Sequence, residues 1–171
     1  MKILNKNSSI CFLIVLLVFS RLIPHPPNFT PLIALTVLSG LLFKNFYISI
    51  FVLVSSMFFS DVIIGFHKNM IFIYLILILI GALFFKFANN FNSKNLLGFS
   101  LTGALLFYLL SNFIVWTSSG MYSYDLKGLL ECYILALPFL SNTIISTVFF
   151  SYLTFFCINK VNNYFYKIKK N

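Results

Sequence analysis

The chain has 171 residues, of which 60% are hydrophobic and 9% charged, and its mean hydropathy is +0.98. A soluble domain of this size needs a largely polar surface, so the composition excludes one and indicates that lipid is the main solvent. The net charge of +9 fits the basic cytoplasmic loops of a membrane protein. We therefore expect an integral membrane protein that contacts lipid and binds no nucleic acid.

Six apolar runs predict an all-α integral membrane fold of six transmembrane helices with short loops. A spanning helix needs about 20 mainly apolar residues, so 171 residues leave room for no second domain, and residues 1–171 are expected to form one. We expect the first run to be an uncleaved helix, although lysines precede it as in a signal peptide. The predicted spans are residues 10–23, 32–43, 46–66, 69–85, 96–116 and 138–158.

The first two runs are separated by Arg21–Pro31, which we call the proline segment. Each proline fixes its own φ and disfavours helix at the preceding residue, so we expect the whole segment to be non-helical. The following run, 32–43, is too short to cross a hydrocarbon core about 30 Å thick. Part of the proline segment is therefore expected to dip into the outer region of the membrane. It is a candidate lid, with His25 and Asn28 as its polar contacts.

The basic residues fall mainly on one side of the six-span arrangement. The side that carries both termini holds most of them, and the positive-inside rule then places both termini in the cytoplasm. We expect the protein to lie in the inner (plasma) membrane. These residues are Lys2, Lys6, Lys44, Lys86, Lys94, Lys160, Lys167, Lys169 and Lys170. All the acids of the chain, Asp61, Asp125 and Glu131, fall on the other, outer side.

Three of the predicted helices carry a polar residue, Asp61, Asn112 or Asn142, at a similar depth below the outer surface. An ionisable group inside a membrane is costly, and by default it faces the bundle interior or water. The pattern therefore predicts an outward-facing polar pocket, with the proline segment and residues 122–131 as its rim. The residues that we expect to bind a small polar solute there are His25, Asn28, Asp61, His67, Asn112, Trp116 and Asn142.

Structural roles are open alternatives for several of these residues. For Asp61, an ion pair with Arg21 is as well supported as solute binding. For Trp116, the alternative is a place in an interfacial aromatic belt. Asn142 has a hydrogen bond to a neighbouring helix as its alternative. Residues 126–137 carry apolar side chains at helical spacing, which predicts an amphipathic helix with Asp125 as its N-cap and a break at the proline that follows.

Four stretches of the sequence together resemble an uncharacterised family of small bacterial integral-membrane proteins, which has no assigned activity. They are Arg21–Leu32, Ser60-Asp61 with Gly65-Phe66-His67, Ser111–Phe113 with Val115-Trp116, and Ala136–Phe139 with Asn142-Thr143. The six-helix plan is also similar, more distantly, to the substrate-binding S-components of energy-coupling factor vitamin transporters. That similarity implies an outward-opening site capped by the loop between helices one and two, and transporter partner subunits. The first helix lacks the small residues four apart through which S-components couple to their partners.

The expected function is the binding or transport of a small polar solute from the outer face. A non-transporting scaffold or assembly subunit is the first alternative. An intramembrane enzyme that uses His25, His67 and the acids is the second. The three cysteines and the two histidines match no metal motif, so we expect no metal, no cofactor, no catalytic residue and no enzymatic activity.

Overall fold

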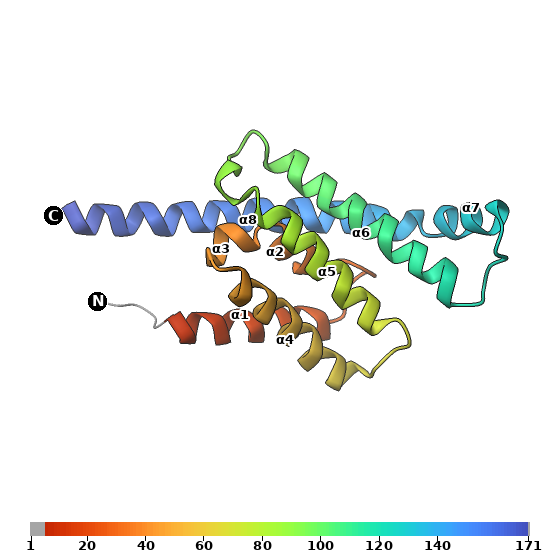
Figure 1. The fold of residues 1–171 in the computed structure, drawn as a ribbon. Coiled ribbons are helices and arrows are strands. Elements are labelled where there is room, and N and C mark those ends of the chain that lie inside the picture. Colours follow the sequence, from red (N-terminus) through yellow and green to blue (C-terminus); the bar gives the residue numbers. More distant parts are fainter. Residues whose placement is uncertain (1–5, 171) are drawn as a thin grey trace.

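The computed structural model describes the backbone of residues 6–170 and the side chains of residues 10–160. Within these residues the fold is all-helical and contains no strand. Figure 1 shows an elongated bundle in which α8 runs past the other helices. The elements are α1 (Lys6–Leu22), α2 (Leu32–Val37), α3 (Ser39–Phe43), α4 (Phe46–Ile64), α5 (Met70–Phe85), the short 3-10 helix η1 (Ala88–Asn90), α6 (Leu96–Ser118), α7 (Leu126–Leu135) and α8 (Leu137–Lys170).

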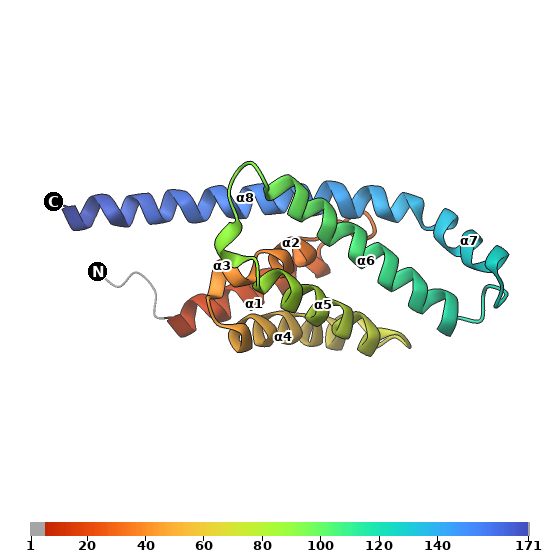
Figure 2. The same cartoon turned by 45° about the horizontal axis from the view of Figure 1, so that its top comes forward.

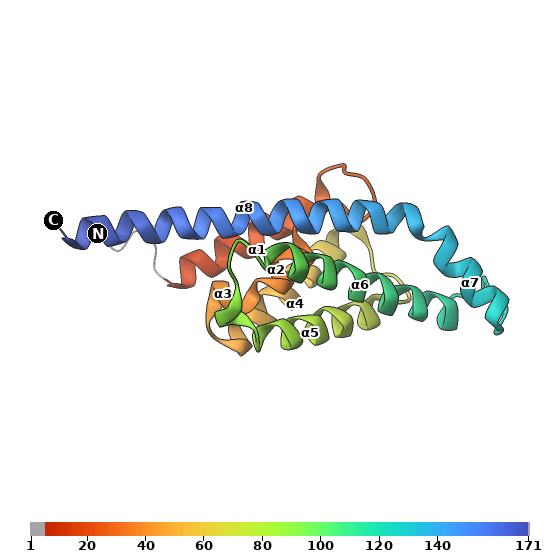
Figure 3. The same cartoon turned by 90° about the horizontal axis from the view of Figure 1, so that it is seen from above.

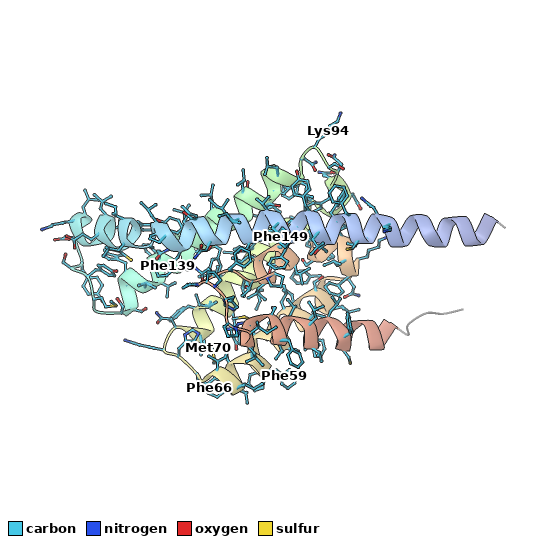
Figure 4. The ribbon with its side chains drawn as sticks, turned by 180° about the vertical axis from the view of Figure 1, so that it is seen from behind. Phe59, Phe66, Met70, Lys94, Phe139 and Phe149 are labelled. Atoms are coloured by element: carbon cyan, nitrogen blue, oxygen red, sulfur yellow. The ribbon has the colours of Figure 1, made fainter. Side chains whose placement is uncertain are left out.

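Three of the described helices are long and apolar enough to cross a membrane. They are α4, α6 and the first part of α8, Leu137–Lys160, while α1 and α5 are apolar but shorter. Large apolar side chains are exposed around the bundle, and Figure 4 shows two of them, Phe59 and Phe149, on its outside. An apolar surface of this extent is unfavourable in water. The bundle is therefore built to associate with a membrane.

The connections between helices sort to two ends of the bundle. Figures 1, 2 and 3 agree that the α3–α4 junction and the α5–α6 connection lie toward the end where α1 begins and α8 ends. We call this the proximal end, and the opposite end, with the α4–α5 and α6–α7 loops, the distal end. Lys44, Lys86 and Lys94 are exposed in the proximal connections. Figure 4 shows Lys94 projecting away from the bundle.

The central element is α2, which contacts α4, α5, α6 and α8. Every residue from Pro31 to Gly40 is buried. The chain bends at Leu38 (φ −87°, ψ 4°), so the predicted run 32–43 forms two short helices, α2 and α3. Glycine permits the close packing: a Cβ at Gly103 of α6 would collide with Cγ2 of Val37. Small residues at such contacts are typical of helices that associate in lipid.

Two boundaries differ from the sequence prediction. The proline segment was expected to be non-helical throughout, but α1 continues through Leu22. The reason is that Pro24 restricts only the residue before it, so Arg21 and Leu22 are free to be helical. The last helix begins at Leu137 and holds Pro138 in its first turn, where a missing N–H costs little. The break between α7 and α8 therefore falls at Ala136.

We expect Gly103→Ala to lower the free energy of unfolding by about 1–3 kcal/mol, because the added methyl group would overpack the contact with Val37. Chemical unfolding in detergent micelles measures this change. Gly98→Ala on the same helix is the matched control. A Cβ there meets nothing within 4 Å, so this variant should be neutral or slightly stabilising. Equal stability of the two variants would contradict the packing of α6 on α2.

Candidate functional site

Two adjoining cavities are lined by the proline segment. The first has a volume of about 440 Å³, and we call it the amide lobe; its polar lining residues are Asn28, Ser111, Asn112, Tyr122 and Cys132. The second has a volume of about 420 Å³, and we call it the histidine lobe; its polar lining residues are Arg21, His25, Asn28, Thr30 and His67. Asn28, Ile73 and Phe107 line both cavities. The two lobes are therefore parts of one pocket.

The histidine lobe brings together residues from two separate connections. Nδ1 of His25 lies 2.9 Å from the carbonyl oxygen of Pro26. An N–H at Nδ1 donates to that oxygen and leaves Nε2 for another partner. His67 follows Gly65, which ends α4 with φ +112°. That conformation is strained for any residue with a Cβ, so the glycine permits the sharp exit from α4 that precedes His67.

A partly buried ion pair lies at the wall of the histidine lobe and joins α1 to α4. Nη2 of Arg21 is 2.7 Å from Oδ1 of Asp61, which confirms the pairing alternative for Asp61. Nη1 of Arg21 donates to the carbonyl oxygen of Met57 at 3.2 Å and to Oγ of Ser60. The hydroxyl of Tyr74 on α5 donates to Oδ2 of Asp61 at 2.6 Å. Both carboxylate oxygens are therefore occupied.

The two partners of the ion pair are not equally accessible. The Arg21 side chain is 17% exposed and lines the histidine lobe, whereas the Asp61 side chain is 1% exposed and lines neither lobe. The carboxylate thus lies behind the guanidinium as seen from the pocket. Arg21 is the charged group that a solute in the histidine lobe would meet.

Hydrogen bonds from α8 hold the proline segment in place. Nδ2 of Asn142 donates to the carbonyl oxygen of Pro27 at 3.1 Å, and Oγ of Ser146 donates to the carbonyl oxygen of Asn28 at 3.2 Å. Asn28 adopts a left-handed conformation with φ +64°, which asparagine tolerates better than most residues. Asn142 itself lines neither lobe. It therefore contacts the proline segment, and Asn28 is the polar residue of that segment that lines both lobes.

Asn112 and Trp116 lie one turn apart on α6 but have different surroundings. Nδ2 of Asn112 donates to the carbonyl oxygen of Tyr108 at 2.8 Å, which leaves Oδ1 for a ligand in the amide lobe. Nε1 of Trp116 donates to the carbonyl oxygen of Ser123 at 2.9 Å, and its ring meets that of Tyr124 edge-on at 5.9 Å. Trp116 lines neither lobe; it secures the α6–α7 loop.

Asp125 begins α7, which contributes Cys132 to the wall of the amide lobe. Its Oδ1 accepts hydrogen bonds from the backbone N–H of Gly128 and from Oγ of Ser123, both at 2.7 Å. The predicted N-cap is thus confirmed. These two bonds hold the pKa of the Asp125 carboxyl below its ordinary value of 3.8, and the bond from the Gly128 N–H has the larger effect.

Sequence reasoning placed Arg21 in the rim of the pocket but not among the residues expected to bind the solute, and it overlooked Tyr74 altogether. A signal for Tyr74 existed, because it carries the only hydrogen-bonding side chain within the run Met70–Phe85. Arg21 likewise ends an apolar helix with no other charge near it in sequence. Among the side chains described for residues 10–160, no group of three or more His, Cys, Asp or Glu could hold a metal ion.

The all-helical architecture and the three long apolar helices define a membrane-associated helical bundle with a polar pocket between its helices. A family described as a family of unknown function (DUF6580) matches residues 1–168, and the chain belongs to it. No curated protein matches the chain, and no solved structure matches it either.

We expect Asp61→Asn to lower the free energy of unfolding by about 3–5 kcal/mol, because it leaves the guanidinium of Arg21 without its counter-ion. Unfolding in detergent measures this loss. The double variant Arg21→Gln with Asp61→Asn removes both charges and should lose less. Lys127→Gln is the control, since it breaks an exposed pair at 4.0 Å and should cost under about 1 kcal/mol. If Asp61→Asn costs no more than this control, the ion pair does not stabilise the fold.

The Asp125 cap predicts a pH dependence confined to α7. A carboxyl whose pKa is lowered by folding stabilises the folded state above its ordinary pKa of 3.8, and this contribution is lost as the pH falls through the lower value. Hydrogen-exchange protection of the α7 amides, corrected for intrinsic rates, should therefore fall when the pH drops below that value. Asp125→Asn keeps a capping oxygen that does not titrate and should abolish the dependence. An unchanged dependence in this variant would assign it to another group.

Proposed function

We propose that the protein crosses the plasma membrane six times and binds a small polar solute from its outer side, as a binding or transport protein. The observation that carries the proposal is the two-lobed pocket at the proline segment. Lobes of about 440 Å³ and 420 Å³ lie within the range typical of small-molecule sites. Amide, hydroxyl and cationic side chains line them, which favours a polar solute over an apolar one.

The six-span topology adds three crossings to the three long helices. In this proposal α1 and α5 each cross once, and α2 with α3 form one broken crossing. Broken or irregular backbone at membrane depth is tolerated only where protein buries it or water reaches it, and the complete burial of Pro31–Gly40 meets this condition. The exposed lysines of the proximal connections support a cytoplasmic location for both termini. The distal end is then the outer side.

The proposed arrangement is similar to that of S-components, in which the loop between helices one and two caps an outward site. Partner subunits that supply energy belong to this proposal, as does the surrounding lipid. The role proposed is recognition of a solute without its chemical conversion.

A second candidate, a membrane assembly subunit, is favoured by one surface feature. An apolar groove of about 880 Å³ runs between α1 and α8 and includes Phe12, Phe19, Phe150 and Leu153. A groove of this size would accommodate a helix of another subunit. Copurification of such a subunit with a pocket that holds no small molecule would favour this candidate over solute binding.

The proposal is tested by purification in a mild detergent and mass spectrometry of the small molecules that the protein releases. A solute should be retained, and Asn112→Leu should weaken its binding about tenfold or more, because the variant removes a hydrogen-bonding group from the amide lobe. Thr102→Ala, on the same helix outside both lobes, should bind normally. Absence of any retained molecule would contradict solute binding. Full affinity in Asn112→Leu would contradict only the assignment of the amide lobe.

A further inference from the structure

We infer that the solute is an anion, with a carboxylate or phosphate group that binds in the histidine lobe. The inference rests on the proposed function and names the chemical class of its solute. It depends on the charges that line the pocket, on the free donor of Arg21 and on the position of every acid in the chain.

The charged and titratable groups that line the histidine lobe are all basic. They are Arg21, His25 and His67, and no carboxylate lines either lobe. Asp61 is the nearest acid, and it is buried behind Arg21. The other two acids lie on or next to α7: Asp125 caps that helix, and Glu131 pairs with Lys127 on its exposed side. A solute in the histidine lobe therefore meets a guanidinium and two imidazoles and no carboxylate.

Arg21 retains a donor for a second anion. A guanidinium has five N–H donors. Nη1 forms the described hydrogen bonds to Met57 and Ser60, and Nη2 forms the ion pair with Asp61. The Nε–H of this side chain, which lines the lobe, has no hydrogen-bond partner among the described residues. Arginine is suited to carboxylate and phosphate because its charged N–H groups form strong hydrogen bonds with them.

Asp61 cannot serve a cationic solute in the same way. Its Oδ1 is paired with Arg21 and its Oδ2 accepts from Tyr74, and the side chain is 1% exposed. An ammonium group in the lobe would meet the guanidinium before it met any carboxylate. A neutral His25 donates its Nδ1–H to the carbonyl oxygen of Pro26 and presents Nε2 as an acceptor, so His67 is the histidine whose neutral form can donate to an anion. The lobe is therefore built to prefer anions.

Charge-selective labelling of an introduced cysteine tests the preference without knowledge of the solute. Cys11, Cys132 and Cys157 are first replaced by alanine, and Thr30→Cys then places one thiol in the histidine lobe. Ile64→Cys, an exposed position of the same lobe, is read in parallel. The reference is Leu126→Cys, which is 71% exposed and lies between Asp125 and Lys127, whose charges oppose each other. The probes are an anionic sulfonatoethyl and a cationic trimethylammonioethyl methanethiosulfonate.

The ratio of anionic to cationic labelling rates should be about tenfold higher in the lobe than at the reference, since a cleft lined by one sign of charge raises on-rates by this order. Replacing both His25 and His67 by Gln should reduce the ratio, and adding Arg21→Gln with Asp61→Asn should reduce it further. A lobe ratio at or below that of the reference at both positions overturns the inference. So does a retained solute that is neutral or cationic, whereas absence of any retained solute overturns the proposed function and leaves the charge preference standing.

Discussion

The complete burial of α2 is the constraint on which the rest of the bundle depends. Lipid tails are as apolar as leucine, so a helix in a membrane is held by close van der Waals contact and not by the hydrophobic effect. The missing side chain of Gly103 lets α6 approach Val37. Because α2 begins directly after Pro31, its position also fixes one end of the proline segment. The pocket lobes form where that segment leaves the packed core.

The ion pair of Arg21 and Asp61 fixes the other end of the proline segment. Arg21 lies in the last turn of α1, where a positive charge also interacts favourably with the helix dipole. Its partners Asp61 and Ser60 come from the distal end of α4, and Tyr74 extends the network to α5. Removing a charge from water is expensive unless its partner is well placed. The same geometry buries Asp61 with a partner on each oxygen and leaves Arg21 partly exposed, so Arg21 both stabilises the fold and lines the pocket.

Much of this arrangement could be predicted from the sequence, and the reasons for the failures are physical. Apolar runs predicted the helices, and the spacing around Asp125 predicted the α7 cap, because both depend on local pattern. The expectation that the whole proline segment is non-helical was wrong at Arg21 and Leu22, because the effect of Pro24 reaches only one residue back. The predicted depth within the membrane spans grouped Asp61, Asn112 and Asn142 as pocket residues. The direction in which each side chain points depends on packing, however. Asn112 lines a lobe, Asp61 pairs with Arg21, and Asn142 bonds to Pro27. No local pattern distinguishes these three outcomes.

The proline segment combines a stiff backbone with weak attachment to α8. Its prolines fix their own φ and remove N–H donors, so it has little conformational entropy to gain by unfolding. Two neutral hydrogen bonds, from Asn142 and Ser146, and the ring contact of Phe29 with Phe150 hold it to α8. Interactions of these kinds contribute about 0.5–1.5 kcal/mol each. Micromolar binding of a solute corresponds to about 8 kcal/mol, which exceeds the sum of the three. The segment is also fixed at both ends, by the ion pair of Arg21 and by α2. On the proposed function a solute therefore enters by displacing the middle of the segment from α8, at a cost below the free energy that binding returns.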